Sequence, residues 1–366
     1  MDGSPPPSRT WAEVDLGAVR HNVRLLRRRA GVSLMAVVKA DAYGHGAVPV
    51  SRAALEAGAD SLAVVTAEEG AELRGAGIGA PILVFTDLPP DGLLAARWHR
   101  LAVTAHSVES AKRIAAVQGL TAHLKVNTGM NRWGVEPSEV GEARKILGDR
   151  LAGVYTHFSS ADSDASETRR QIERFDAVLA DQPFGGLPVH AANSAALLWH
   201  PKSRYDLVRP GISLYGLHPK GDGGDPAEEG LRPAMTLKSY VADTRRLSPG
   251  EGVSYGLTFR AGEPVFAATV PVGYAEGYRR ALSGRAEALI RGARRPLLGR
   301  VTMDACVFGV DDGVEVGDEV VLFGEQGEGR VSAEELGRLA GTINYEITTG
   351  INPRRVERSY TDVRGT

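Results

Sequence analysis

The stretch SLMAVVKADAYGHG, residues 33–46, joins a run of apolar residues to a polar loop punctuated by glycines. A short apolar run of this kind predicts a buried strand. The run ends on Lys39, and burial at the end of a strand lowers the pKa of a lysine. The amine then becomes available as a nucleophile or as a Schiff-base partner. The alternative is a lysine whose long side chain reaches out to solvent.

The same pattern, an apolar run followed by a polar-faced segment with helical spacing, repeats along residues 30–210. The eight runs cover residues 33–39, 61–66, 81–86, 101–105, 122–127, 151–157, 187–192 and 205–209. Helical spacing of apolar residues is clearest at 108–119, 138–149 and 166–181. Alternating β and α segments predict a parallel sheet covered by helices, and eight units predict a (β/α)₈ barrel. A doubly wound open sheet is the alternative.

Chemically reactive residues follow the ends of these runs. They are Lys39 after the first run, Arg132 after the fifth, His157 after the sixth, Asn193 and Ser194 after the seventh, and Arg209 after the eighth. In barrels of this type the active site lies at the C-terminal ends of the strands. We therefore expect these side chains to share one site at that rim.

Composition is that of an ordinary globular protein, with 366 residues, 43% hydrophobic and 24% charged. A formal charge of −2 gives no electrostatic reason to expect nucleic acid or an anionic membrane as a partner, and no apolar run is long enough to cross a bilayer. The single cysteine, Cys306, excludes an internal disulfide and a cysteine-rich metal site. Residues 1–9 read as a short disordered lead-in without a secretory signal. We expect a cytoplasmic protein with no metal.

The pattern of apolar and polar residues changes after residues 217–233, which are rich in glycine, proline and acidic residues. Beyond them, apolar and polar residues alternate between glycine-rich turns, as in antiparallel β structure. We predict a barrel over residues 13–234 and a mainly-β domain over 235–366, to which residues 9–12 add a strand. Asp15 is predicted to cap the first helix.

A Schiff-base lysine needs a carbonyl partner, either a substrate, as in a class I aldolase, or pyridoxal 5′-phosphate. Ser194 is predicted to begin a helix, and Gly211 and Ile212 follow the last barrel run. Backbone N–H groups and a hydroxyl after the last two strands form the recurrent phosphate site of barrels, which favours pyridoxal 5′-phosphate. Ser194 as a simple helix cap is the alternative. The phenols of Tyr43 and Tyr345 are candidate donors to the same phosphate.

Nine motifs, one of them within the opening stretch, occur in a fixed order along the chain. They are AVVKADAYGHG (36–46), LKVNTGMNRWG (124–134), THFSSAD (156–162), HAANSAA (190–196), VRPGISLYG (208–216), GVSYG (252–256), VPVGYAEGYRR (270–280), GRVTMDA (299–305) and GTINYE (341–346). With these motifs the chain resembles the bacterial, pyridoxal-phosphate-dependent alanine racemases, whose barrel is shared with eukaryotic-type ornithine decarboxylases. The resemblance runs from WAEVDLGAVRHN (11–22) to about Tyr360.

The resemblance implies Lys39 as the cofactor-bearing lysine and Tyr255 as a second base, contributed by the other subunit of a head-to-tail homodimer. Racemisation removes the α-proton from one face and returns a proton to the other, which two flanking bases do most simply. A tyrosine has a reference pKa near 10 and needs neighbouring cations to act as a base. The resemblance points to His157 and Arg209 for that relay.

Arg209 is placed by the resemblance against the pyridine nitrogen of the cofactor. An arginine is always protonated and accepts no hydrogen bond, so the ring nitrogen stays unprotonated. The weaker electron sink that results suits racemisation over transamination. A structural ion-pair partner is the alternative role for this arginine.

The remaining roles implied by the resemblance concern the substrate. Arg132 holds the phenolic oxygen of the cofactor and the substrate carboxylate, and the partner subunit offers the Met303 amide with Asp304 beside it. Tyr274 resembles a gate in the entry path, and Lys125 matches a position where some family members carry a carbamylated lysine. A plain solvent-facing lysine is the alternative there. The chain differs from the usual family pattern at Asn127 (usually Asp), Asn131 (often Gly), Thr302 (often Cys) and 347–355.

The predicted function is therefore the interconversion of L- and D-alanine by a two-base mechanism that uses pyridoxal 5′-phosphate. One alternative is a broader racemase acting on serine or basic amino acids. Another is a pyridoxal-phosphate-dependent decarboxylase, against which Arg209 and Tyr255 argue. A non-catalytic pyridoxal-phosphate-binding protein would need only the barrel, and an aldolase would leave the β domain unexplained.

Overall fold

The computed structural model describes residues 9–362 of the chain. The predicted disordered lead-in falls mostly on residues 1–8, which lie outside that range. The described chain divides into two compact units, one formed by Val19–Tyr215 and the other by residues 9–18 together with 216–362. We call them the barrel unit and the β unit.

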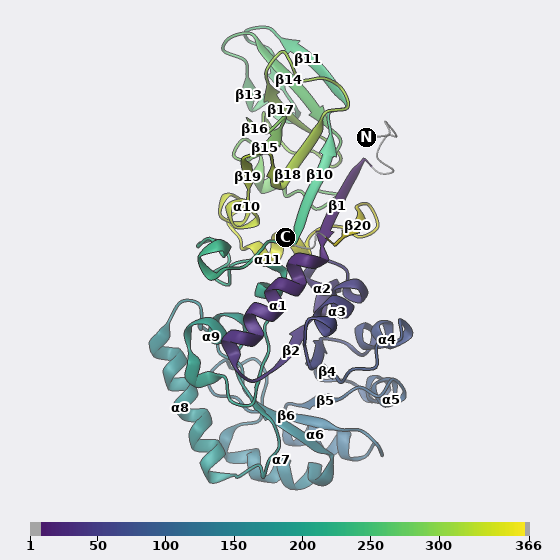
Figure 1. Ribbon diagram of the computed structural model, residues 1–366, viewed down its shortest axis with the longest axis vertical. Coiled ribbons are helices and arrows are strands. Elements are labelled where there is room, and N and C mark those ends of the chain that lie inside the picture. The colour runs from purple at the N-terminus through teal and green to yellow at the C-terminus, as the bar shows by residue number, and fades with distance from the viewer. Residues whose placement is uncertain (1–8, 363–366) are drawn as a thin grey trace. The chain divides into compact units, whose positions relative to one another are not determined.

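The barrel unit contains eight strands, all paired in parallel (Figure 1). They are β2 (Ser33–Val37), β3 (Ser61–Val64), β4 (Ile82–Val84), β5 (Val103–Ala105), β6 (Ala122–Lys125), β7 (Leu151–Tyr155), β8 (Val189–His190) and β9 (Leu207–Val208). Their order is β4-β3-β2-β9-β8-β7-β6-β5, and a parallel bridge between Leu83 and Ala102 joins the two ends of that series. The predicted (β/α)₈ barrel is thus confirmed, and the open-sheet alternative is wrong.

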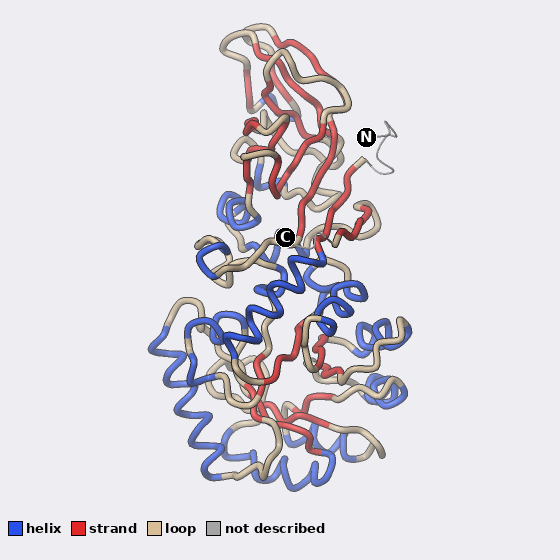
Figure 2. Tube along the Cα trace, in the orientation of Figure 1, coloured by secondary structure: helices blue, strands red, loops and turns tan. Residues whose placement is uncertain are grey.

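Helices alternate with these strands and surround them (Figure 2). They are α1 (Leu16–Ala30), α3 (Ala47–Glu56), α4 (Ala67–Gly75), α5 (Pro90–Trp98), α6 (Val108–Ala115), α7 (Val140–Leu147), α8 (Ala165–Asp181) and α9 (Ser194–Trp199). Local side chains set their starts, since Asp15 accepts from the amides of Gly17 and Ala18, as predicted. Strands such as β3 are buried along their whole length because helices cover one face and the barrel interior the other.

The β unit is mostly antiparallel. Its strands are β1 (Thr10–Asp15), β10 (Met235–Tyr240), β11 (Asp243–Leu247), β12 (Gly252–Val253), β13 (Phe259–Arg260), β14 (Val265–Val270), β15 (Glu287–Ile290), β16 (Ala293–Pro296), β17 (Cys306–Val310), β18 (Glu319–Gln326), β19 (Gly329–Val331) and β20 (Glu357–Thr361), with helices α10 (Ala333–Ala340) and α11 (Asn344–Thr349). The strand predicted before the first helix is present as β1, which lies between β10 and β20.

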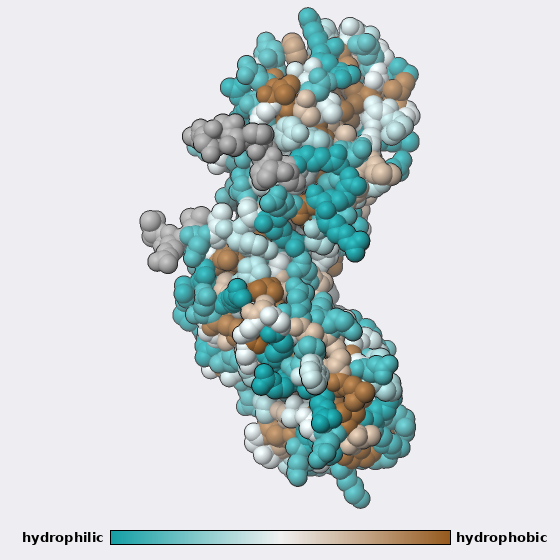
Figure 3. Space-filling model, turned by 90° about the vertical axis from the view of Figure 1, so that its right-hand side faces the viewer, coloured by the Kyte–Doolittle hydropathy of each residue, from teal (hydrophilic) through white to brown (hydrophobic). Residues whose placement is uncertain are grey.

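The surface carries no continuous apolar face on the side shown in Figure 3, where hydrophobic residues form small separate patches among polar ones. Within residues 9–362, no helix is both long enough and apolar enough to cross a membrane.

Candidate active site

The structure places the predicted residues of the barrel unit just after the C-terminal ends of its strands. Strand β2 ends at Val37, two residues before Lys39, and β9 ends immediately before Arg209. Strand β7 ends two residues before His157, and β6 ends on Lys125 itself. Since parallel strands present these ends at one rim, these residues lie at that rim, and their sharing of one site stays a prediction.

Lys39 begins α2 (Lys39–Tyr43), a single turn of left-handed helix. The four residues from Ala40 to Tyr43 have φ angles of 51° to 53°. L-residues adopt this conformation at a cost of roughly 1–2 kcal/mol each, so the surroundings must hold the turn in place. The Glu69 carboxylate accepts from the Ala40 amide at 2.7 Å, and the Asp41 carboxylate accepts from the Ala47 amide at 2.7 Å. These contacts fix the backbone directly beyond Lys39.

Four cationic side chains, Lys39, Lys125, Arg132 and Arg209, gather at this rim. Lys125 Nζ lies 5.9 Å from the Trp133 ring centroid, and Arg132 Cζ lies 5.7 Å from the same centroid. Burial, and next the charge of Arg132, lowers the pKa of Lys39. Burial and the positive charges of the other three lower the pKa of Lys125 to about 8. Within residues 9–362 none of the four forms an ion pair, so the cluster suits an anionic ligand.

Arg209 is buried, with both terminal nitrogens engaged. Its Nη2 donates to the carbonyls of Thr156 at 2.7 Å and Ala191 at 2.9 Å, and lies 3.5 Å from His157 Nδ1. Its Nη1 lies 2.8 Å from His190 Nδ1. Burial lowers the pKa of Arg209 to about 10, which leaves the guanidinium charged at neutral pH. Burial, and next the charge of Arg209, holds the pKa of His157 well below its usual value.

Sequence reasoning missed two histidines behind Arg209. His190 is fully buried, stacks on Tyr155 with ring centroids 4.8 Å apart, and places Nε2 at 2.8 Å from His123 Nδ1. A signal was available, because His123 lies two residues before Lys125 in one strand and therefore points to the same side. The pairing of His123 with His190, 67 residues apart, needs the register of the barrel.

The loop after β9 meets the start of α9 in a compact polar cradle. Ser194 Oγ accepts from the amides of Gly211 at 3.0 Å and Ser213 at 3.3 Å. The capping alternative for Ser194 is wrong, because Asn193 caps α9 by accepting from the Ala196 amide at 2.9 Å. Ile212 is buried and begins the short 3₁₀ turn Ile212–Tyr215.

Two observations show that this cradle fits a phosphate group. A Cβ added at Gly211 would lie 2.5 Å from the Tyr43 hydroxyl oxygen, so only glycine brings this amide and this phenol so close. The Ser213 hydroxyl is buried and has no hydrogen-bond partner in the described part of the chain. Burial raises the pKa of Tyr43 above its usual value, which keeps the phenol protonated as a donor.

The other predicted residues belong to the β unit. Tyr255, Tyr274 and Met303 are 75%, 44% and 56% exposed, and Asp304 is exposed beside Met303. Their loops are joined in series, because Ser254 Oγ donates to the Arg300 carbonyl at 2.8 Å and the Tyr274 amide donates to the Thr302 carbonyl at 3.1 Å. The structure therefore brings the Tyr255, Tyr274 and Met303 loops together within this unit. Tyr345 lies on α11, where its hydroxyl donates to the Pro219 carbonyl at 3.3 Å.

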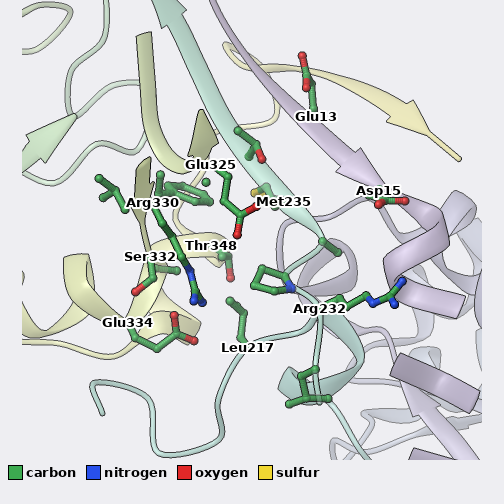
Figure 4. Close-up of a pocket in the computed structure, with 18 of the residues that line it drawn as sticks. Glu13, Asp15, Leu217, Arg232, Met235, Glu325, Arg330, Ser332, Glu334 and Thr348 are labelled. Atoms are coloured by element: carbon green, nitrogen blue, oxygen red, sulfur yellow. The ribbon is translucent and has the colours of Figure 1, made fainter. Parts of the chain in front are cut away.

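A pocket of about 450 Å³ lies elsewhere in the β unit (Figure 4). Arg330, Thr348 and Glu334 reach into it, and no predicted site residue lines it. Arg330 pairs with Asp225 at 3.2 Å, and Glu334 accepts from the His218 amide at 3.0 Å. These polar groups therefore serve the packing of the unit.

Comparison with known proteins assigns the family. The family model described as the alanine racemase N-terminal domain matches residues 14–219, and that of the alanine racemase C-terminal domain matches residues 234–360. The chain belongs to the alanine racemase family. An alanine racemase from Symbiobacterium thermophilum is 46% identical over 98% of each chain, and alanine racemase 1 from Bacillus subtilis is 41% identical over 94% of this chain and 91% of the relative.

Solved alanine racemases share the fold as well. The enzyme from D-cycloserine-producing Streptomyces lavendulae superposes with a TM-score of 0.91 at 40% identity, over 97% of this chain and 98% of its own. The Bacillus anthracis alanine racemase with bound L-Ala-P gives 0.89 at 36% identity, over 99% and 97%. The chain is thus an isomerase of the alanine racemase family.

Proposed function

We propose that this chain interconverts L- and D-alanine with pyridoxal 5′-phosphate as its cofactor. The observation that carries the proposal is the cluster of Lys39 with Lys125, Arg132 and Arg209, none of which forms an ion pair within the described residues. It lies at the same barrel rim as the phosphate-shaped cradle of Ser194 and Gly211. When bound, pyridoxal phosphate supplies a ring that delocalises the electron pair left at the α-carbon.

Different residues of the barrel unit would hold different parts of the cofactor. Lys39 would carry it covalently, and the Arg209 guanidinium, which can only donate hydrogen bonds, would face the ring nitrogen and keep it unprotonated. The phosphate would be held by the hydroxyl and amide donors of the cradle. The cofactor-binding set is Lys39, Tyr43, His157, Asn193, Ser194, Arg209, Gly211, Ile212 and Tyr345.

Two bases would move the proton on opposite faces of the α-carbon. The lowered pKa of Lys39 favours a neutral amine that takes or returns the proton on one face. Tyr255 of the partner subunit would serve the other face. The 75% exposure of Tyr255 in a single chain supports this division, because its hydroxyl is presented outward rather than packed on its own sheet. Arg209 would supply the positive charge that lowers the pKa of that phenol. His157, whose pKa is held well below its usual value, would be the neutral member of the relay.

Substrate binding would use Arg132 for the alanine carboxylate and the partner subunit's Met303 amide for its second oxygen. Within residues 9–362 the Met303 N–H donates to no acceptor, which leaves it available to a ligand. Asp304 would shape this corner of the pocket, and Tyr274 would gate the entrance.

Lys125 would be carbamylated, because the carbamate anion would offset the positive charge of Arg132 and Arg209 around it. Carbamylation joins the neutral amine nitrogen to the carbon of CO₂ and releases one proton. The cation-rich surroundings of Lys125, and its freedom from ion pairs among the described residues, support this assignment.

The deciding experiment measures D-alanine formed from L-alanine by the purified holoenzyme, with L-serine and L-arginine in parallel. We expect fast turnover of alanine alone. Equal turnover of all three would move the function to a broad racemase, and no turnover of any would overturn the proposal. The cytoplasmic location stays a prediction from the sequence.

A further inference from the structure

We propose that His123, which lies behind the site and has no role assigned above, is a positioning residue for racemisation. Acting through His190, it fixes the hydrogen-bonding state of the ring that orients Arg209. The inference rests on the proposed function, because the importance of Arg209 comes from there. Its physical basis is the chain of contacts from Arg209 to His190 to His123.

The direction of each hydrogen bond from Arg209 through His190 to His123 follows from the fact that arginine can only donate. Arginine only donates, so His190 Nδ1, at 2.8 Å from Arg209 Nη1, must be an unprotonated acceptor. The proton of a neutral His190 is then on Nε2, which faces His123 Nδ1 at 2.8 Å. His123 Nδ1 must therefore accept, and His123 carries its own proton on Nε2.

Neutral rings are what this environment requires. His190 is 0% and His123 8% exposed, and the nearby charge acting on both is the guanidinium of Arg209. Burial, and next that charge, holds the pKa of His190 well below its usual value and lowers the pKa of His123 to about 4. Within residues 9–362 no carboxylate accepts a hydrogen bond from either ring, so no anion offsets the charge of Arg209 there.

Packing alone does not select the tautomer of His190. Its ring plane is set by Tyr155, which lies parallel within 9°. Stacking is the same for either tautomer, whereas two contacts favour the proton on Nε2: the Arg209 donor at Nδ1 and the acceptor at the position of His123 Nδ1. Without that acceptor, His190 can place a proton on Nδ1, where it would face the Arg209 guanidinium donor to donor. The guanidinium would then lose one of the partners that orient it.

His123 also lines a cavity of about 860 Å³. Ser33 and Ser61, the first residues of β2 and β3, line the same cavity, so it opens at the N-terminal ends of the strands, opposite Lys39. A small solute can therefore reach His123 without entering the active site. This makes free imidazole a suitable probe for a variant that lacks the His123 ring.

The test compares His123→Leu with His123→Asn in the purified holoenzyme. The Asn side chain keeps an acceptor oxygen at the position of Nδ1, whereas Leu removes it. We expect His123→Leu to lower kcat for L-alanine by about 10- to 100-fold, by analogy with the outer partners that fix the tautomer of metal-bound histidines, with little change in KM. His123→Asn should stay within about twofold of the parent. In His123→Ala, imidazole should restore part of the lost kcat.

A second readout does not depend on activity. Long-range ¹⁵N–¹H NMR on protein labelled at its nine histidines reports which nitrogen of His190 carries the proton. We expect Nε2 in the parent and in His123→Asn, and Nδ1 or a mixture in His123→Leu. An unchanged tautomer with unchanged kcat in His123→Leu would overturn the inference, as would equal losses in the Leu and Asn variants. A parent that fails to racemise alanine while showing this tautomer would overturn the proposed function instead.

Discussion

At the scale of single residues, Asn127 organises the loop that carries Arg132. Its Nδ2 donates to Glu136 Oε1 at 2.7 Å and to Asn131 Oδ1 at 3.0 Å, and its Oδ1 accepts from the amides of Gly129 and Asn131. Asn131 has a φ of 54°, a conformation that asparagine tolerates better than most residues, which explains why it can replace the usual glycine. The two departures from the family pattern are therefore parts of one hydrogen-bonded loop.

Restoring the family's usual aspartate should damage this loop. Asn127→Asp places two carboxylates at the 2.7 Å contact with Glu136, because an ionised carboxylate cannot donate. We expect a loss of about 1 kcal/mol in the free energy of unfolding and a raised KM for alanine, measured by urea denaturation and initial rates. The matched control is Asn127→Asp with Glu136→Gln, in which the Gln amide donates to the new carboxylate. Equal effects in the single and double variants would contradict the argument.

Lys125 gives a prediction that depends on pH. An amine with a pKa of about 8 is about one-tenth neutral at pH 7, whereas at the ordinary value of 10.5 less than about one part in a thousand is neutral. Because only the neutral amine reacts with CO₂, carbamate should form more readily as the pH rises from 6 towards 8. We expect a ¹³C carbamate signal in protein equilibrated with ¹³C-bicarbonate, and none in Lys125→Arg. A spectrum identical in the two proteins would refute carbamylation.

At the scale of elements, the left-handed turn α2 stores strain that a glycine should relieve. Ala40 is exposed at a φ of 51°, so Ala40→Gly loses no packing. Relief of roughly 1–2 kcal/mol, less an entropic cost of about 0.5–1 kcal/mol, should stabilise the protein by about 0.5–1 kcal/mol in urea denaturation. Ala177→Gly, at an exposed position inside right-handed α8, is the matched control and should destabilise by about 1 kcal/mol. Destabilisation by both substitutions would show that α2 is unstrained.

The turn α2 also separates what could be predicted from the sequence from what could not. The eight strands and their rim were predictable, because apolar runs and strand ends are local properties of the sequence. The left-handed path was not, since the residues of α2 include no glycine and the turn depends on Glu69, which lies 29 residues from Ala40. In the same way, the assignment of the helix cap to Asn193 rather than Ser194 depends on the loop at Gly211, which takes the serine hydroxyl as its acceptor.

The loop that bears Tyr274 is held by a buried carboxylate. Glu276 is fully buried and accepts from Arg9 at 2.8 Å, Arg355 at 2.7 Å and the Gly273 amide at 2.9 Å. Glu276→Gln should lower the free energy of unfolding by about 3 kcal/mol, because two guanidinium groups lose their anion. Asp243→Asn, at the exposed pair with Arg245, is the control and should change little. Comparable losses in the free energy of unfolding would show that Glu276 contributes no more to stability than an exposed ion pair.

At the scale of the whole molecule, the chemistry is divided between two units. The barrel unit holds the cations and the phosphate-shaped cradle, whereas Tyr255, the proposed second base, and the Met303 amide belong to exposed loops of the β unit. Large exposed side chains that gather in one place mark an interaction surface, and the loops of Tyr255, Tyr274 and Met303 are joined in this unit. The proposed homodimer, in which each β unit completes the partner's barrel, would account for this division.

Complementation between inactive chains tests that arrangement. Lys39→Ala lacks the amine proposed to bear the cofactor and Tyr255→Ala lacks the proposed second base, so each homodimer should be inactive. If the sites are shared, a mixed dimer has one site with both residues intact and one with neither. Random exchange at equal amounts makes about half of the dimers mixed, so about a quarter of the parent activity should return. The control is a mixture of Lys39→Ala with Lys39→Arg, which restores no lysine in any dimer and should stay inactive in either case. Subunit exchange is verified by mass spectrometry. If exchange occurs and no activity returns, each chain builds its site alone.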